Sequence, residues 1–278
     1  MKAIYDNYCI DASRMVTKQY STSFYAGVKA LDKDIRADIH NIYGFVRFAD
    51  EIVDSFHDYD KAELLQEFKE DTFKSIERGI SLNPILNSFQ CTINKYNIDH
   101  ELIIQFLHSM EMDLRQVDYT PMKYEEYILG SAEVVGLMCL KIFVLGDQKE
   151  YERLRPYAMK LGSAFQKINF LRDMQSDIDD LGRLYFPNLD ISNITVEDKM
   201  RIEEEIQKEF DDALIGIKML PKRARFGVYV SYKYYRRLLA EIKRKTAHEL
   251  MSSRIRVPDS TKLLVFAKSY VRNSVNLL

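Results

Sequence analysis

Hydrophobic residues recur at helical spacing along nearly the whole chain, and short polar stretches with glycine or proline interrupt them. This pattern predicts about ten helices, most of roughly 15 to 25 residues. Thr120 before Pro121 is typical of an N-cap followed by proline at the first helical position. Thr195 and Asp198 resemble a capping box that begins a helix ending near Met219. The interruptions fall near residues 27–32, 57–60, 79–84, 97–99, 118–121, 146, 181–195, 221 and 258.

The composition favours one globular, all-α domain over residues 1–278. Hydrophobic residues make up 46% of the chain and charged residues 29%, which is enough apolar surface for a sizeable core. The 10 Gly and 6 Pro are too few for the many turns of a sandwich, a barrel or a doubly wound sheet. No linker rich in serine and glycine divides the chain. We therefore expect a single all-helical domain.

The sequence also excludes several classes of functional site. No two glycines have the spacing of a dinucleotide-binding loop or a Walker phosphate loop, and the five histidines form no H-E-x-x-H motif. Cys9, Cys91 and Cys139 are widely separated, which suits a reducing compartment and no structural zinc. The 40 Lys and Arg nearly balance the 42 Asp and Glu, giving a net charge of −2, so we expect no nucleic-acid partner.

The chain has no segment that predicts a membrane span. Its longest apolar run, Val134 to Leu145, is interrupted by Lys141 and is shorter than the roughly 20 residues that a bilayer requires. No charged segment followed by an apolar one opens the sequence, so we expect a cytoplasmic protein.

Charge is distributed unevenly along the chain. Residues 221–278 hold 14 Lys or Arg against 3 Asp or Glu, a net charge of +11, so the preceding 220 residues carry −13. Charge pairing within the protein, an anionic ligand and an anionic membrane surface are three explanations. From the basic quarter of the chain we expect peripheral contact with the cytoplasmic face of an anionic membrane.

Two of the expected helices each carry a polar stripe with a pair of aspartates. In the helix predicted over residues 35–56, the stripe consists of Tyr43, Arg47, Asp50 and Asp54. In the helix predicted over residues 151–178, it consists of Gln166, Asn169, Asp173 and Asp177. Spacings of three and four residues place each set on one face of its helix.

The residue types beside these aspartates favour a functional site over an acidic helix face that is simply exposed to solvent. The chain has 23 aspartates and four pairs spaced four residues apart, of which about two are expected by chance, so the pairs alone are weak evidence. Mg²⁺ prefers oxygen ligands and is commonly held between carboxylates and substrate phosphates. Arg47 and Arg172 could bind phosphate oxygens in bidentate geometry. The stripes therefore indicate a Mg²⁺ site, with Mn²⁺ as an alternative ion, that assists departure of a diphosphate.

The stripes and their flanks resemble the squalene and phytoene synthase family, the head-to-head prenyl transferases. The resemblance covers roughly residues 10 to 270 and is carried by S-T-S-F-Y at 21–25, Y-G-F-V-R-F-A-D-E-I-V-D at 43–54, M-D-L at 112–114, S-A-E-V-V-G at 131–136, Q-K-I-N-F-L-R-D-M-Q-S-D at 166–177, G-R-L-Y-F-P at 182–187 and R-I-R-V at 254–257. The first aspartate motif looks most like that of bacterial phytoene synthases.

The resemblance implies an isoprenoid synthase fold, in which about ten helices surround a central cavity and the two aspartate helices face each other across it. It also implies two prenyl diphosphate substrates bridged to the aspartates by Mg²⁺. One substrate ionises, its allylic cation is attacked by the double bond of the other, and the resulting cyclopropyl diphosphate ionises in turn.

The resemblance assigns roles residue by residue. It implies that metal is held by Asp50, Asp54, Asn169, Asp173 and Asp177. It implies that diphosphate is bound by Ser21, Ser23, Arg47, Gln166, Arg172 and Arg254. It implies that the catalytic residues are Tyr43, Arg47, Tyr127, Arg172 and Tyr235, with the tyrosines near the reacting carbons.

Three further points concern residues around these motifs. We expect Arg183 and Tyr185 in a loop that covers the site, while Asp113 is either another metal-side residue or part of a buried ion pair. The chain departs from the family at Tyr20, where some relatives have histidine, and at Glu133, which replaces a common glycine. These two departures bear on substrate length.

The leading hypothesis is a phytoene synthase that joins two geranylgeranyl diphosphates. The first alternative is a C30 enzyme that uses farnesyl diphosphate and makes dehydrosqualene, or squalene if NADPH supplies hydride. The alternative of another class is a non-catalytic helical assembly factor. A chain-elongating prenyl transferase is disfavoured because D-D-x-x-D is absent. The oligomeric state stays open.

Overall fold

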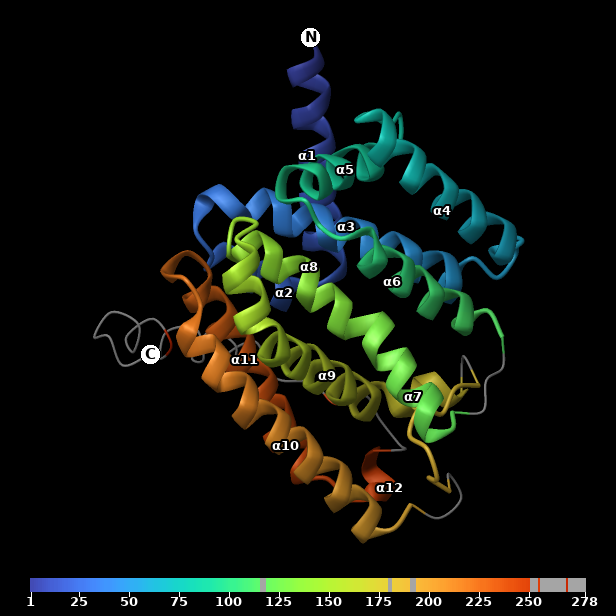
Figure 1. Ribbon diagram of the computed structural model, residues 1–278. Helices are drawn as coiled ribbons and strands as arrows, with labels where there is room; N and C mark the ends of the chain where they lie inside the picture. Colours follow the sequence, from blue (N-terminus) through green and yellow to red (C-terminus); the bar gives the residue numbers. More distant parts are fainter. Residues whose placement is uncertain (116–118, 180–181, 191–193, 251–254, 256–268, 270–278) are drawn as a thin grey trace.

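The structure, a computed structural model, describes residues 1–115, 119–179, 182–190 and 194–250, together with 255 and 269. Within these residues the regular elements are helices and none is a strand, which confirms the predicted all-α fold (Figure 1). In chain order they are α1 (Lys2–Tyr20), α2 (Thr22–Lys29), α3 (Lys33–Ser55), α4 (Lys61–Arg78), α5 (Pro84–Tyr96), α6 (His100–Asp113), α7 (Pro121–Ile128), the π-helical turn η1 (Leu129–Glu133), α8 (Val134–Phe143), α9 (Gln148–Asp179), α10 (Val196–Met219), α11 (Lys222–Lys243) and α12 (Ala247–Leu250).

Both predicted helix starts are confirmed. The Thr120 hydroxyl accepts a hydrogen bond from the Lys123 amide at 3.4 Å, and Pro121 opens α7. The Thr195 hydroxyl accepts one from the Asp198 amide at 3.0 Å, and α10 then continues to Met219 as predicted.

One helix boundary is absent from the prediction. Ser21 interrupts what the hydrophobic pattern shows as a continuous helix, because its backbone is extended and its hydroxyl accepts a hydrogen bond from the Phe24 amide at 3.2 Å. Serine competes for backbone groups in this way at helix starts. The chain therefore turns between α1 and α2.

Five helices form a closed ring around the centre of the molecule. Each helix in the order α3, α8, α9, α11, α2 packs against the next, and α2 packs against α3. The two stripe-bearing helices, α3 and α9, lie on opposite sides of this ring, and α8 packs against both. Outside the ring, α1 and α5 cover α3, and α10 covers α9 and α11.

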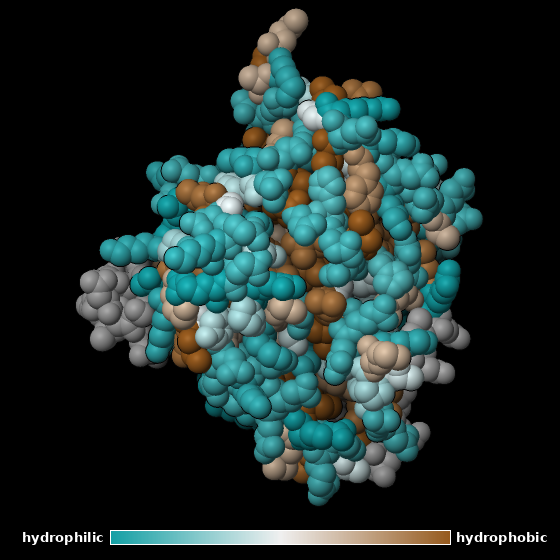
Figure 2. Space-filling view, in the orientation of Figure 1, coloured by the Kyte–Doolittle hydropathy of each residue, from teal (hydrophilic) through white to brown (hydrophobic). Residues whose placement is uncertain are grey.

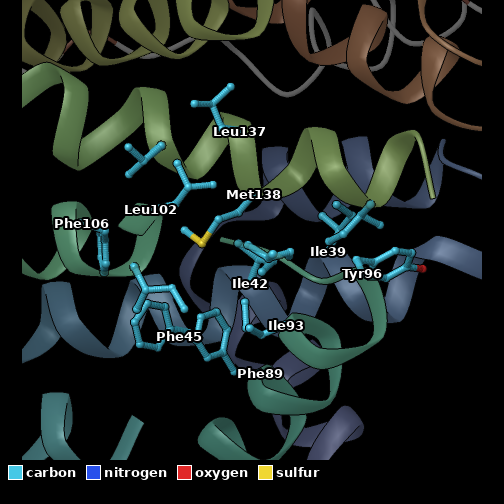
Figure 3. Close-up of a cluster of buried hydrophobic side chains, with 14 of the residues drawn as sticks. Ile39, Ile42, Phe45, Phe89, Ile93, Tyr96, Leu102, Phe106, Leu137 and Met138 are labelled. Carbon is cyan, nitrogen blue, oxygen red and sulfur yellow. The ribbon is translucent and has the colours of Figure 1, made fainter. Parts of the chain in front are cut away.

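The core behind α3 is largely aromatic and aliphatic. Phe45 is fully buried, and its ring stacks on that of Phe89 at 3.9 Å between centroids, with Phe106 at 5.5 Å (Figure 3). Truncating a phenylalanine in such a position costs about 3–5 kcal/mol. This packing fixes the face of α3 that lies opposite the polar stripe.

The surface is mainly hydrophilic, with a band of hydrophobic residues along the middle of the face in view (Figure 2). Among the described residues, no helix is both long and apolar enough to cross a membrane. Residues 251–254, 256–268 and 270–278 of the basic C-terminal quarter lie outside these residues. The expected membrane contact therefore stays a prediction.

A buried polar network joins α1, α3 and α5. The Thr17 hydroxyl donates to the Ser13 carbonyl oxygen at 2.9 Å, so the His40 Nδ1–H donates to Thr17 Oγ1 at 3.0 Å. The hydroxyls of Ser13 and Ser88 continue the network at 2.7 Å. Burial lowers the pKa of His40 to about 4, because charging the ring would require desolvating a cation.

Replacing His40 with glutamine is expected to flatten the dependence of unfolding free energy on pH between 4 and 6.5. The folded-state pKa is about 4 and the ordinary value is 6.5. The unfolded state therefore binds more protons in this window, and the histidine lowers stability by up to about 3 kcal/mol as pH falls. Urea unfolding of wild type and variant at several pH values measures the slope. An unchanged slope in His40→Gln would contradict the assignment.

Candidate active site

Among the described residues, the ring of helices surrounds a cavity of about 290 Å³. Its wall is mainly aliphatic and aromatic, with side chains from α2, α3, α8, α9, α10 and α11. Representative lining residues are Phe24, Ile42, Val135, Ala158, Leu161, Phe165 and Ile217. Such a space suits an apolar chain rather than a polar small molecule.

Small residues let the helices around the cavity approach closely. A Cβ added to Gly162 in α9 would lie 2.8 Å from the Ala132 carbonyl oxygen of η1, and one added to Gly216 in α10 would lie 2.3 Å from the Tyr157 Cβ. Any larger side chain would push the wall apart or displace its neighbour. These glycines therefore set the width of the cavity.

The wall is polar where the two stripes reach the cavity, at Tyr43 from α3 and at Gln166 and Asn169 from α9, with Tyr235 from α11 beside Asn169. Ser131, Tyr157 and Ser231 are its other polar members. The Tyr235 hydroxyl donates to Asn169 Oδ1 at 3.2 Å, and its ring stacks on Phe165 at 3.9 Å. The Tyr43 ring stacks on Phe24 at 4.7 Å. Two tyrosines predicted to lie near the reacting carbons thus line the cavity.

The four aspartates continue the stripes beyond this polar end. Asp50 follows Tyr43 by seven residues and Asp173 follows Asn169 by four, which are advances of about 10 Å and 6 Å along their helices. Arg183 connects the far ends of the two stripes: its amide donates to the Asp177 carbonyl oxygen of α9 at 2.8 Å, and its side chain donates to Asp54 Oδ1 of α3 at 2.9 Å. The Asp54 and Asp177 ends of the stripes therefore lie near one another, and we call the region around the four aspartates the mouth of the cavity.

Three arginines partly neutralise the carboxylates. Arg47 pairs with Glu51 and lies 4.0 Å from Asp50, and the Arg172 Nε donates to Asp173 Oδ1 at 3.0 Å. The third arginine, Arg183, belongs to the segment after α9 and reaches Asp54.

The neutralisation is incomplete. Burial, with repulsion from neighbouring carboxylates, raises the pKa of Asp50 and of Asp177 to about 7. Asp113 also has a pKa of about 7, chiefly because of burial, although Arg183 and a hydrogen bond from Tyr127 oppose the shift. Additional positive charge at this mouth would lower the free energy of the ionised carboxylates.

The donor set fits a hard divalent cation. Carboxylate oxygens are available from both helices and amide oxygens from α9, and burial with repulsion from neighbouring carboxylates raises the pKa values of Asp50 and Asp177. Among the described residues no three carboxylate, histidine or cysteine side chains converge on one point. Mg²⁺ usually takes only one or two carboxylates from a protein and keeps several waters.

Arg183 is placed by the end of α9. Gly182 adopts a left-handed backbone, and the amides of Gly182 and Arg183 donate to the carbonyl oxygens of Ile178 and Asp177 at 3.1 and 2.8 Å. The turned chain directs the Arg183 side chain to Asp54 Oδ1 at 2.9 Å. As expected, the segment that contains Arg183 lies against the site.

Tyr127 occupies a different environment from the other two predicted tyrosines. It is 3% exposed and donates from its hydroxyl to Asp113 Oδ2 at 2.8 Å. Its ring lies 5.1 Å from Tyr185, which in turn stacks on Phe170 at 4.1 Å. Tyr127 is absent from the described cavity wall and supports the segment around Arg183.

The predicted diphosphate ligands are only partly brought together. Arg47 and Gln166 lie on the two stripes, Arg172 lies beside Asp173 of the second stripe, and Ser21 forms the cap of α2. Ser23 is half-buried in the first turn of α2. Arg254 lies outside the described residues.

Glu51 has no predicted role in the site, and Tyr20 and Glu133 are expected to bear only on substrate length. The Tyr20 ring covers the Arg47 guanidinium at 4.5 Å, and Glu51 pairs with the same arginine. The spacing of four residues between Arg47 and Glu51 is the signal that could have revealed that pair. Glu133 is not among the residues that line the cavity. Burial raises its pKa, the charge of Lys160 opposes this rise, and the charge of Glu209 adds to it.

Comparisons with known proteins agree with this arrangement. A dehydrosqualene synthase crystal structure covers 97% of this chain and 98% of its own, with a TM-score of 0.83 at 17% identity. The squalene synthase HpnC from Alicyclobacillus acidocaldarius covers 87% and 95%, with a TM-score of 0.74 at 21% identity. These likenesses show the fold.

Sequence relatives include the phytoene synthase of Arthrospira platensis, 26% identical over 94% of this chain and 92% of that protein. Phytoene synthase 2 of Solanum lycopersicum is 28% identical over 94% and 89%. A presqualene diphosphate synthase from Sinorhizobium fredii is 30% identical over 65% and 64%. The family model for squalene/phytoene synthase matches residues 17–261. With these two facing carboxylate stripes above an apolar cavity, the chain belongs to the squalene/phytoene synthase family of head-to-head prenyl transferases.

Proposed function

We propose that this prenyl transferase joins two geranylgeranyl diphosphates to form phytoene in a reaction that depends on Mg²⁺. The observation that carries the proposal is the length of the apolar cavity below the carboxylates. The named relatives include phytoene synthases from a bacterium and a plant, which supports the same product.

The cavity wall on α9 extends from Asn169 to Leu154. Fifteen residues of helix correspond to about 22 Å. At roughly 1.2 Å per bond of an extended chain, a C20 prenyl group reaches about 18 Å and a C15 group about 13 Å. A C20 chain with its diphosphate at the stripes would therefore end beside Tyr157, still inside the wall.

The carboxylates at the mouth of the cavity and its apolar wall would have different roles in the reaction. Bound Mg²⁺ would stabilise the departing diphosphate, with Asp50, Asp54, Asn169, Asp173 and Asp177 as the residues that hold it. Arg47 and Arg172 would bind diphosphate oxygens from either side of the mouth. The apolar wall excludes water from the allylic cation, and the Tyr43, Phe165 and Tyr235 rings offer it electron-rich faces.

Two specific observations bear on the alternatives. The solved neighbours include a dehydrosqualene and a squalene synthase, so farnesyl diphosphate, with NADPH in the squalene case, is the second candidate chemistry. A non-catalytic assembly factor has less support, because both carboxylate pairs and their arginines are present on α3 and α9, the two helices that line the cavity from different sides.

Product analysis distinguishes the two chain lengths. Purified protein incubated with Mg²⁺ and geranylgeranyl diphosphate is expected to yield phytoene by mass spectrometry, with no requirement for NADPH. Parallel incubations use farnesyl diphosphate with and without NADPH. Efficient turnover of farnesyl but not geranylgeranyl diphosphate would refute the C20 proposal and support the C30 alternative.

Asp50→Asn and Asp173→Asn are each expected to lower turnover at least about hundredfold, because each removes a ligand charge from one side of the mouth. Circular dichroism should show an unchanged helical fold. The matched control is Asp58→Asn, which alters an exposed aspartate from another pair spaced four residues apart. Wild-type turnover in either stripe variant would contradict the metal assignment.

Ala158→Phe is expected to shift selectivity from C20 to C15 substrate. Ala158 lines the cavity eleven residues before Asn169, or about 16 Å along α9, so a phenyl ring there would obstruct only the longer chain. The ratio of kcat/KM for the C20 substrate to that for the C15 substrate should fall at least about tenfold. The exposed Ala62→Phe serves as control. An unchanged ratio would show that the prenyl chain does not follow α9.

A further inference from the structure

The Arg183 side chain occupies the carboxylate cluster at the mouth of the cavity. Its Nη1 donates to Asp54 Oδ1 at 2.9 Å, and its Nη2 donates to the Asp113 carbonyl oxygen at 2.9 Å. Its Nε lies 3.6 Å from Asp113 Oδ1. One guanidinium thus joins a carboxylate of the first stripe to the end of α6.

The surroundings hold this guanidinium in place. The side chains of Arg183 and Asp113 are 12% and 3% exposed, whereas that of Asp54 is 35% exposed. The Arg183 amide is bonded to the Asp177 carbonyl oxygen at the end of the second stripe. Two residues further on, Tyr185 is buried against Tyr127 and Phe170. The backbone of Arg183 is therefore held in place. Of the two carboxylates that its side chain approaches, Asp54 is the one that is open to solvent.

From this geometry we propose that Arg183 is a positioning residue that serves as the internal counter-cation of Asp54 and competes with a divalent ion for it. The inference depends on the proposed metal dependence of the site. An ion that takes Asp54 Oδ1 as a ligand must displace Arg183 Nη1 from that oxygen, and an ion on the second carboxylate oxygen would lie beside a guanidinium that repels it. Asp113 retains part of the guanidinium, so the displacement moves Arg183 away from Asp54 without leaving its charge unpaired.

The competition has two consequences. Without substrate, Arg183 stabilises the mouth but weakens cation binding, so the empty site resists occupation by divalent ions. Binding of an ion also removes the link between α3 and the segment 182–190. Metal occupancy and the mobility of this segment should therefore change together.

Mn²⁺ binding to the full-length protein without any substrate tests the proposal. Electron paramagnetic resonance of free Mn²⁺ gives the dissociation constant for wild type, Arg183→Gln and Arg183→Lys. We expect Arg183→Gln to bind Mn²⁺ at least about fivefold more tightly than wild type, because a neighbouring opposite charge has been removed, whereas Arg183→Lys should stay close to wild type. The matched control is Arg201→Gln, which removes an exposed arginine paired with Asp198 at 3.1 Å.

Hydrogen exchange of residues 182–190 supplies a second readout. Added Mn²⁺ should speed exchange in wild type, and Arg183→Gln should exchange rapidly without the ion. Mn²⁺ affinity that is equal in wild type and Arg183→Gln, or undetectable in both, would overturn the inference.

Turnover of prenyl diphosphates by wild type tests the proposed function separately. An active wild type with unchanged Mn²⁺ affinity in Arg183→Gln would refute only the role of Arg183. Tighter Mn²⁺ binding in Arg183→Gln with an inactive wild type would refute only the proposed reaction.

Discussion

Burial of carboxylates that also repel one another, beside an apolar cavity, is the constraint on which the rest of the structure depends. Asp54 and Asp177 lie on different helices, yet the charge of Asp54 helps to raise the pKa of Asp177, and burial raises the pKa of Asp50 to about 7. Arg47 and Arg183 offset part of this charge from within the protein. The remaining deficit is what a diphosphate accompanied by divalent cations would satisfy, since such a ligand brings its own positive charge to both helices.

The fold keeps the two stripes close without letting them collapse together. The helix α8 packs against both α3 and α9, so it sets the separation of the stripes, while close contacts at Gly162 and Gly216 keep the walls tight around the cavity. The same walls exclude water from the interior. One site could therefore stabilise both a reactive allylic cation, among the aromatic rings, and a charged diphosphate leaving group, at the mouth.

Much of this arrangement could be predicted from the sequence because it depends on local periodicity. Helical spacing aligned both stripes, and the caps at Thr120 and Thr195 marked two helix starts correctly. The break at Ser21 was missed because a single side-chain hydrogen bond outweighs the hydrophobic pattern there. The choice of Asp54 as the partner of Arg183 depends on how the chain turns after α9 and on the distant helix α6, and helical periodicity carries no signal for either.

The most direct test of the central claim is a crystal structure with Mn²⁺ and a non-hydrolysable prenyl diphosphate analogue, using anomalous scattering to locate the ions. The account predicts anomalous peaks between the Asp50/Asp54 and Asp173/Asp177 pairs, with the diphosphate beside them and the prenyl chain running along α9 into the cavity. Ions bound elsewhere, or a prenyl chain lying outside the ring of helices, would contradict it.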